Sequence, residues 1–270
     1  MSIRQFRPRE RSRRGMTSKQ SWILYSVIGL SIFLQILYPL AHGGLLRFTT
    51  IAFIYTGAFA MLIHALFSYG PKYFTIYLFT TFLFALGIEQ VGSRSGWPFG
   101  TYHYSTSLGL QIYGVPLVVP FAWLMMAHPI LIISRKITHH WIFLIGGFGL
   151  AVWDLFVDPL MVSSGRWSWK LVGPSVPLEP SIPLSNSAGW RLSGMALIAI
   201  LHKILPKERR KVGASTGAVD FFLVWTIFSG VVGNIFFFHS PGVALVGGIP
   251  FGILMFVYFF NSRLGRPDQF

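Results

Sequence analysis

The chain of 270 residues contains no cysteine, which excludes a disulfide framework, a thiolate zinc site and an iron–sulfur cluster. Its histidines are scattered, and no HExxH pair of the metalloprotease type is present. Charge is also scarce, since only 11% of the residues are charged and only eight are acidic. Soluble domains carry roughly 25% charged residues. The scarcity of charge therefore argues against a soluble globular protein.

Apolar residues are abundant instead, at 53% of the chain, with a mean hydropathy of +0.59. They gather in eight runs, most of them close to the roughly 20 residues that a helix needs to cross a bilayer. The pattern predicts an all-α, polytopic helical membrane protein with about eight transmembrane helices. The expected spans are 22–40, 49–68, 73–91, 112–134, 141–160, 188–205, 219–238 and 243–260.

The expected organisation is a single transmembrane helical domain, residues 22–260, between a basic cytoplasmic tail, 1–21, and a short cytoplasmic tail, 261–270. The first apolar run is long for the core of a signal peptide, and no small-residue cleavage site follows it. It is therefore expected to be retained as a span.

The net charge of +14 would suit nucleic acid, but its distribution argues against such a partner. Basic residues cluster beside apolar runs, which is typical of topology signals and of anchors to anionic lipid. If the N-terminus lies in the cytoplasm and the spans alternate, 17 of the 22 basic residues fall inside and five outside. The bias predicts that both termini are cytoplasmic and that the partner is the lipid bilayer.

Three of the eight acidic residues lie in or at the edge of apolar runs: Glu89, Asp154 and Asp158. A charge is expensive there, so such residues are functional candidates. In the predicted topology Glu89 and Asp158 end outward-running spans, and Asn186 precedes another span on the same side. The sequence therefore predicts one site in the outer half of the membrane.

Asp154 and Asp158 are four residues apart and would share one face of a helix. Two buried carboxyl groups repel each other and lose solvation, so one of them is expected to keep its proton at neutral pH. Such a pair can supply an acid and a base, and Glu89 would be a third catalytic group. The structural alternative is that Asp158 caps a turn before Pro159 and that arginines neutralise the acids.

The same carboxylates, together with His103, could in principle hold magnesium or another hard cation. The aspartates do not form a DDxxD-like run, however, and no basic phosphate-binding loop faces them. No metal is therefore expected.

Aromatic residues, 17% of the chain, surround the acidic residues along the sequence. They fit either the aromatic belt of a membrane interface or the walls of a pocket for a long apolar substrate, where their faces would stabilise a carbocation. The predicted substrate-binding residues are Trp97, Phe99, Tyr102, His103, Tyr104, Trp123, Trp153, Trp167, Trp169, Asn186, Trp190 and Arg191.

Two further patterns concern structure rather than chemistry. Prolines recur every third residue from Pro174 to Pro183, which predicts a polyproline II segment that acts as a spacer or as a lid. His64, His128 and Asn234 lie in apolar runs, where hydrogen bonds between helices are the more frequent role of such residues.

Several ordered motifs resemble the CruF-type carotenoid hydratases of bacteria and haloarchaea. The resemblance covers residues 40–240, nearly all of the predicted membrane part. The motifs that carry it are Gly96-Trp97-Pro98-Phe99-Gly100, Tyr102-His103-Tyr104, Gly114-Val115-Pro116, Trp153-Asp154-Leu155, Asp158-Pro159, and Pro183-Leu184-Ser185-Asn186 with Gly189-Trp190.

This resemblance implies carotenoid biosynthesis in a prokaryotic cell membrane. The implied reaction hydrates the terminal double bond of an acyclic ψ end group to a tertiary alcohol, without a cofactor. Asp154 or Glu89 would then be the acid, and Asp158 would be the base or would position the water. A carotenoid such as lycopene or a bacterioruberin precursor is the implied substrate, and other carotenoid-biosynthesis enzymes are candidate partners.

Three alternatives remain open at this point. The chain could be a transporter or binding protein for a lipid or polyene, although no inverted repeat is evident. It could be a non-catalytic subunit that holds other pigment enzymes. It could also catalyse a different cation-mediated reaction on a lipid, such as isomerisation or cyclisation.

Overall fold

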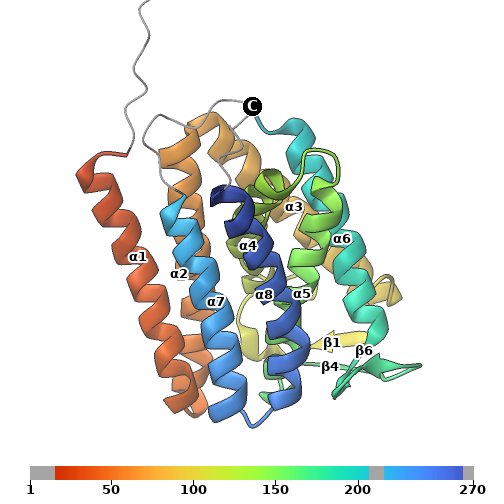
Figure 1. The fold of residues 1–270 in the computed structure, drawn as a ribbon. Coiled ribbons are helices and arrows are strands. Elements are labelled where there is room, and N and C mark those ends of the chain that lie inside the picture. Colours follow the sequence, from red (N-terminus) through yellow and green to blue (C-terminus); the bar gives the residue numbers. More distant parts are fainter. Residues whose placement is uncertain (1–15, 207–215, 264–270) are drawn as a thin grey trace, which may run out of the picture.

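A computed structural model describes residues 16–206 and 216–263, which form a bundle of eight long helices (Figure 1). The residues outside these ranges, 1–15, 207–215 and 264–270, include most of both predicted tails and four of the five basic residues between Lys203 and Lys211. The helices are α1 (Ser18–Leu37), α2 (Gly43–Tyr69), α3 (Pro71–Ser95), α4 (Val118–Ile137), α5 (Ile142–Ser163), α6 (Leu184–Ile204), α7 (Gly217–Phe236) and α8 (Pro241–Arg263).

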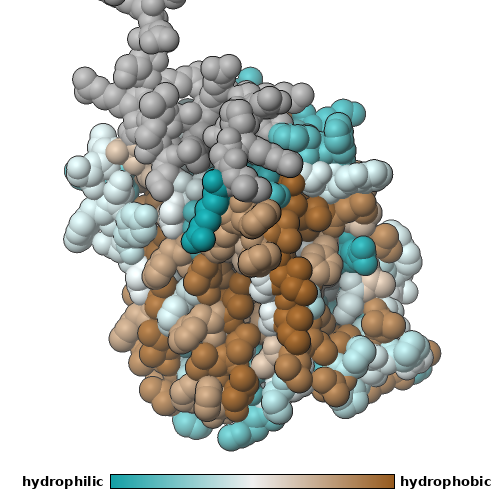
Figure 2. All heavy atoms as spheres, viewed as in Figure 1, coloured by the Kyte–Doolittle hydropathy of each residue, from teal (hydrophilic) through white to brown (hydrophobic). Residues whose placement is uncertain are grey.

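Seven of these helices are long and apolar enough to cross a membrane, and α6 is the exception within the described residues. Helix α6 has 21 residues but opens with the polar run Ser185-Asn186-Ser187. Large apolar side chains such as Phe228 and Phe256 are more than half exposed on the flank of the bundle. Figure 2 shows this apolar flank between two ends where hydrophilic residues gather. The all-α polytopic fold that the sequence predicts is confirmed.

Successive helices run up and down, so the start of α1 and the end of α8 lie at the same end of the bundle (Figure 1). This agrees with the alternation of eight spans. The side of the membrane on which that end lies stays a prediction.

One predicted boundary was wrong. Residues 112–117 belong to a short hairpin, β2 (Gln111–Ile112) with β3 (Val115–Pro116), and α4 begins only at Val118.

Helix α4 lies at the centre of the bundle and is buried along most of its length. His128 of α4 lies 2.9 Å from His64 of α2 between ring nitrogens, and its other ring nitrogen lies 3.3 Å from the Tyr73 hydroxyl of α3. The predicted role of these histidines between helices is confirmed. The prediction was wrong for Asn234, whose amide donates to Gly230 O of its own helix at 2.8 Å.

Helices α5 and α6 approach each other closely because glycines lie at their crossing. A Cβ on Gly147 of α5 would come within 2.6 Å of the Arg191 backbone oxygen of α6, and a Cβ on Gly194 of α6 would lie 3.1 Å from the Gly147 Cα. Small residues at such crossings let backbones meet in membranes. This contact fixes α6, and with it Asn186, against the acidic face of α5.

Short strands cover one end of the bundle. Strand β1 (Tyr102–Tyr104), from the loop after α3, pairs antiparallel with β4 (Trp167–Trp169), from the loop after α5. The proline-rich segment forms a hairpin of β5 (Ser175–Val176) and β6 (Glu179–Pro183). The predicted polyproline II segment was therefore wrong, because Leu178 takes a positive φ of 64° that turns the chain back on itself.

Candidate active site

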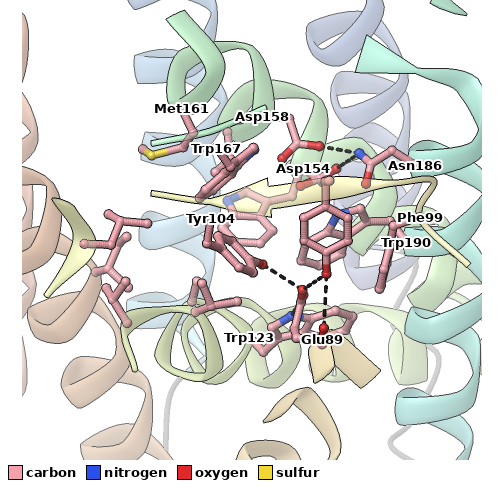
Figure 3. A pocket seen from close by; sticks show the side chains of 18 of the residues that line it. Glu89, Phe99, Tyr104, Trp123, Asp154, Asp158, Met161, Trp167, Asn186 and Trp190 are labelled. Atoms are coloured by element: carbon pink, nitrogen blue, oxygen red, sulfur yellow. Dashed lines mark hydrogen bonds between the residues drawn. The ribbon is translucent and has the colours of Figure 1, made fainter. Parts of the chain in front are cut away.

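Residues from three helices meet in a cavity that the β1–β4 ladder covers at one end of the bundle. Helix α3 contributes Glu89, α5 contributes Asp154 and Asp158, and α6 contributes Asn186. All four side chains are buried, with at most 3% of any of them exposed. The convergence predicted from the sequence is therefore present in the structure, as Figure 3 shows.

The ladder supplies an aromatic roof. Tyr102 pairs with Trp169 and Tyr104 with Trp167. Successive side chains of a strand point to opposite faces, so these four rings share the face that lines the cavity, whereas His103 between them points outward and is exposed. The Tyr-His-Tyr and Trp-Ser-Trp motifs thus form one aromatic surface.

Glu89 is surrounded by hydrogen-bond donors. Its Oε2 atom accepts from the Tyr102 hydroxyl at 2.6 Å and from the Tyr104 hydroxyl at 2.7 Å, and its Oε1 atom accepts from Trp123 Nε1 at 3.1 Å. Both carboxyl oxygens therefore act as acceptors. Three such donors stabilise the ionised form of a buried carboxylate.

The two tyrosines lie outside the membrane-spanning helices, and their acidity follows from their surroundings. Burial raises the pKa of the Tyr102 phenol, and the negative charge of Glu89 raises it further. The pKa of Tyr104 is raised well above its usual value for the same two reasons. Both phenols therefore keep their protons and remain donors to Glu89.

Asp154 and Asp158 have far fewer donors. They lie one turn apart on α5, and the side-chain amide of Asn186 donates to both, to Asp154 Oδ2 at 3.1 Å and to Asp158 Oδ2. The Asp154 Oδ1 atom is buried and accepts no hydrogen bond from the described residues. The two carboxyl groups are also within hydrogen-bonding reach of each other.

The site thus holds two unlike acidic centres. In the described part of the chain the Glu89 carboxyl group accepts from two tyrosines and a tryptophan, whereas the aspartate pair accepts from Asn186 and has the Trp167 indole beside Asp158. Within the described residues no arginine donates to any of the three, so the arginine alternative finds no support in the hydrogen bonds. Two buried carboxyl groups that share one amide donor are best accommodated with a proton between them.

The walls of the cavity are rich in aromatic side chains. The rings of Trp123 and Trp190 stack with centroids 4.3 Å apart and an interplanar angle of 12°, and Trp153 meets Trp190 edge-on at 5.9 Å. The cavity contains about 590 Å³ of space between its walls, counting its mouth. It is lined by Ile54, Glu89, Phe99, Tyr102, Tyr104, Leu108, Val118, Val119, Ala122, Trp123, Trp153, Asp154, Val157, Asp158, Met161, Trp167, Trp169, Asn186 and Trp190.

Phe99 is held between two glycines. A Cβ on Gly92 of α3 would come within 2.7 Å of one edge of its ring, and a Cβ on Gly189 of α6 within 2.6 Å of the other edge. The Gly92 Cβ would also lie 2.8 Å from the Tyr102 hydroxyl. The two glycines therefore make room for Phe99 beside the donors of Glu89.

Three predicted substrate-binding residues lie elsewhere. Trp97 is 62% exposed, His103 and Arg191 are also exposed, and none of the three lines the cavity. Conversely, seven apolar lining residues were not predicted. Val157 and Met161 could have been found, because they follow Trp153 at a spacing of four along α5.

The described residues contain no group of three or more histidine and acidic side chains placed to hold a metal ion.

The eight helices of the described residues, with buried carboxyl groups under an aromatic roof, define a polytopic membrane protein with an aromatic-rich cavity. Residues 49–260 match the family model of carotenoid biosynthesis proteins, and the chain belongs to this family.

A curated relative is the bisanhydrobacterioruberin hydratase of Haloarcula japonica, which is 28% identical over 158 residues, covering 55% of this chain and 52% of that protein. The chain thus matches about half the length of that relative. No solved structure matches the chain.

Proposed function

We propose that this protein hydrates the terminal double bond of an acyclic carotenoid end group, without a cofactor, in the cell membrane of a prokaryote. The observation that carries the proposal is the pairing of two unlike acidic centres in one aromatic cavity: a donor-poor pair, Asp154 and Asp158, and a donor-rich carboxylate, Glu89. Family membership and the hydratase activity named for the relative support the same reaction.

In the first step the proton held by the aspartate pair moves to C-2 of the terminal double bond. The π electrons form the new C–H bond and leave a tertiary cation at C-1. Protonation of an isolated alkene needs a proton donor directly beside the double bond, and two buried carboxyl groups that cannot both ionise keep one proton available there.

Glu89 and the indole rings then stabilise the cation. The Glu89 carboxylate is kept in place by Tyr102, Tyr104 and Trp123, so it does not need to reorganise as positive charge develops. The indole rings of Trp123, Trp153 and Trp190 line the same cavity and supply electron-rich surface for a cation. They also exclude bulk water, which limits side reactions of the cation.

In the last step a water molecule adds to C-1 and returns a proton to the aspartates. Two buried polar atoms of the lining have no partner in the described residues: Asp154 Oδ1, an acceptor, and Trp167 Nε1, a donor. A water molecule between such groups would accept from Trp167 and donate to Asp154. The C–O bond forms, one O–H bond of the water breaks, and the aspartate pair regains the proton it lost.

The proposal is tested by pigment analysis in cells that accumulate lycopene and, separately, in cells that accumulate a C50 acyclic precursor. The protein should yield a more polar pigment heavier by one or two waters with an unchanged chromophore. Asp154→Asn, Asp158→Asn and Glu89→Gln should each lower the product about 100-fold or more. His103→Ala, on the outer face of β1, serves as the matched control and should retain activity.

The same assay separates the alternatives. Isomerisation or cyclisation would give a product of unchanged mass, and a transporter or binding protein would give no new pigment and would tolerate the three substitutions. In heavy water each hydration should place one carbon-bound deuterium in the product. Wild-type yields from Asp154→Asn and Glu89→Gln would refute the mechanism.

A further inference from the structure

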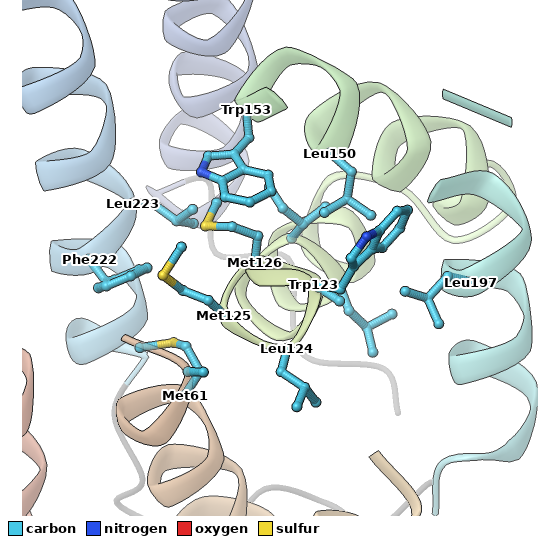
Figure 4. Packing of buried hydrophobic residues seen from close by; sticks show 14 of the residues in the cluster. Met61, Trp123, Leu124, Met125, Met126, Leu150, Trp153, Leu197, Phe222 and Leu223 are labelled. Atoms are coloured by element: carbon cyan, nitrogen blue, oxygen red, sulfur yellow. The ribbon is translucent and has the colours of Figure 1, made fainter. Parts of the chain in front are cut away.

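A second cavity lies beside the first, between α1, α2, α4, α5 and α7. It contains about 810 Å³ of space, counting its mouth, and its walls include Phe53, Met125, Phe156 and Phe222. Figure 4 shows Met125 on the side of α4 that faces Phe222 of α7, whereas Trp123 lies on the side that faces α6. Helix α4 thus presents one side to each cavity.

The two cavities share part of their walls. Five residues line both: Ile54, Ala122, Trp153, Val157 and Met161. Three of these follow one another at a spacing of four on α5, and the neighbouring stripe of α5 carries Asp154 and Asp158. The space beside the aspartates therefore borders directly on the second cavity along one face of α5.

Three polar side chains of the second cavity lie on α7 and donate to the backbone of that helix. Thr226 donates to Phe222 O at 2.8 Å, Ser229 to Thr226 O at 3.3 Å, and Asn234 to Gly230 O at 2.8 Å. The donors of these three side chains are already used, and the remaining polar groups of the lining are Gln35 and the buried Tyr38 hydroxyl, so the lining offers a ligand mainly apolar and aromatic contact. A hydrocarbon suits such a surface better than a polar solute does.

The second cavity also reaches the seam between α1 and α7 on the lipid-facing flank. Gln35 of α1 lines the cavity and accepts a hydrogen bond from Trp225 Nε1 of α7 at 3.2 Å across the seam. On the same helix the ring of Phe228 lies 5.6 Å from that of Trp225, and Phe228 is 54% exposed toward the bilayer. A molecule dissolved in the membrane can therefore approach the cavity from the side.

We propose that the second cavity binds the conjugated chain of the polyene whose end group occupies the carboxylate cavity. The inference rests on the proposed function, which it extends from the reacting end to the body of the substrate. A conjugated polyene is a stiff rod, so an end group held beside Asp154 requires a continuous apolar passage for the rest of the molecule. The shared α5 wall provides that continuation.

The test uses full-length protein purified in detergent from cells that accumulate lycopene. The measured quantity is the visible absorbance of bound polyene per protein. Ser229→Val and Ser229→Phe place graded bulk in the second cavity, and Thr226→Phe does the same one turn earlier. Val224→Phe adds the same ring to the lipid-facing side of α7 and is the matched control.

Wild-type protein and Val224→Phe should retain the polyene. Ser229→Phe and Thr226→Phe should retain at least about fivefold less, and Ser229→Val an intermediate amount, each with an unchanged elution profile. Equal retention in all variants would overturn the proposal, as would wild-type protein that holds lipid acyl chains and no polyene. Wild-type protein that holds polyene but forms no hydrated pigment would refute the proposed hydration and leave the second cavity standing.

Discussion

Glu89 and Asp154 are both buried carboxyl groups, yet the donors around them differ, and the difference separates their proposed roles. Glu89 accepts from Tyr102, Tyr104 and Trp123, whereas Asp154 shares the Asn186 amide with Asp158. Hydrogen bonds to the ionised form favour it. In the proposed mechanism the lasting negative charge therefore belongs to Glu89, and the mobile proton to the aspartate pair.

The tyrosine donors give a pH prediction. In the unfolded chain Tyr102 and Tyr104 would ionise near their ordinary pKa of about 10, whereas in the folded protein burial and the Glu89 charge raise both pKa values. The folded state then binds more protons above pH ~10, so its stability falls as pH rises, by up to about 1.4 kcal/mol per pH unit for each tyrosine.

Thermal unfolding in detergent between about pH 9 and 11 measures this effect. The Tyr102→Phe/Tyr104→Phe double variant cannot ionise at these positions, so its melting temperature should fall less steeply than that of the wild type. Parallel curves of melting temperature against pH for the wild type and the double variant would contradict this prediction, because they would show that the two phenols titrate alike in the folded and unfolded states.

Asn186 is expected to be a positioning residue. In Asn186→Leu the two aspartates lose their shared donor, and a hydrogen bond to a charged group contributes about 1.5–3 kcal/mol. Hydration should slow about 10- to 100-fold in kcat with little change in KM, because the end group binds to the aromatic walls. A wild-type kcat, or a loss confined to KM, would contradict this role.

The sequence identified Glu89, Asp154 and Asp158 as candidates because charges are costly in apolar spans, and Asn186 because it precedes a span on the same side of the membrane. It could not pair Glu89 with its donors, because Tyr102, Tyr104 and Trp123 come from other elements and were predicted only as apolar walls. It also could not separate His103 from its neighbours. Only the register of β1 with β4 turns the two tyrosines inward and His103 outward.

At the scale of elements, the contact between α5 and α6 sets the geometry of the aspartate site. Glycines at positions 146, 147 and 194 bring the two helices together. The sequence predicted both spans but not their pairing, since a glycine in a span does not reveal its partner. The proline-rich hairpin was also missed. The spacing of the prolines does not reveal the positive φ of Leu178, at which the chain turns back on itself.

Gly147→Ala should destabilise the protein although alanine favours helices. The added Cβ would meet the Arg191 backbone oxygen at 2.6 Å and the Met195 nitrogen at 2.9 Å, and backbone atoms cannot move aside cheaply. Overpacking of this kind costs about 1–3 kcal/mol, which should lower the melting temperature by several degrees.

Gly87→Ala is the matched control for this substitution. Gly87 lies in α3 with no atom within 4 Å of an added Cβ, so alanine there should be neutral or stabilise by about 0.5–1 kcal/mol. Equal melting temperatures for the two variants would show that the α5–α6 crossing is looser than the structure indicates.

At the scale of the whole molecule, the roof of the site and the connection between α2 and α3 lie at opposite ends of the bundle. We expect the roof to face outward, because most basic residues then fall inside. Since the chain has no cysteine, Ser168→Cys on β4 and Lys72→Cys at the start of α3 each create a unique label site.

A membrane-impermeant maleimide on intact cells should label the cysteine at position 168. It should reach the cysteine at position 72 only after permeabilisation. The reverse pattern would invert the proposed topology and leave the fold unchanged.

In the proposed mechanism the carboxylate cavity accepts one end of a rod-shaped polyene. Within the described residues, Glu89 and the aspartate pair line this cavity and not the second one. A carotenoid with two ψ ends must therefore dissociate, turn end for end in the bilayer and bind again before its second end can react. Catalysis is then distributive: in a time course the singly hydrated pigment should accumulate first and the doubly hydrated pigment should follow after a lag. The ratio of the two pigments at steady state would reflect how fast substrate exchanges with the membrane as well as how fast water adds.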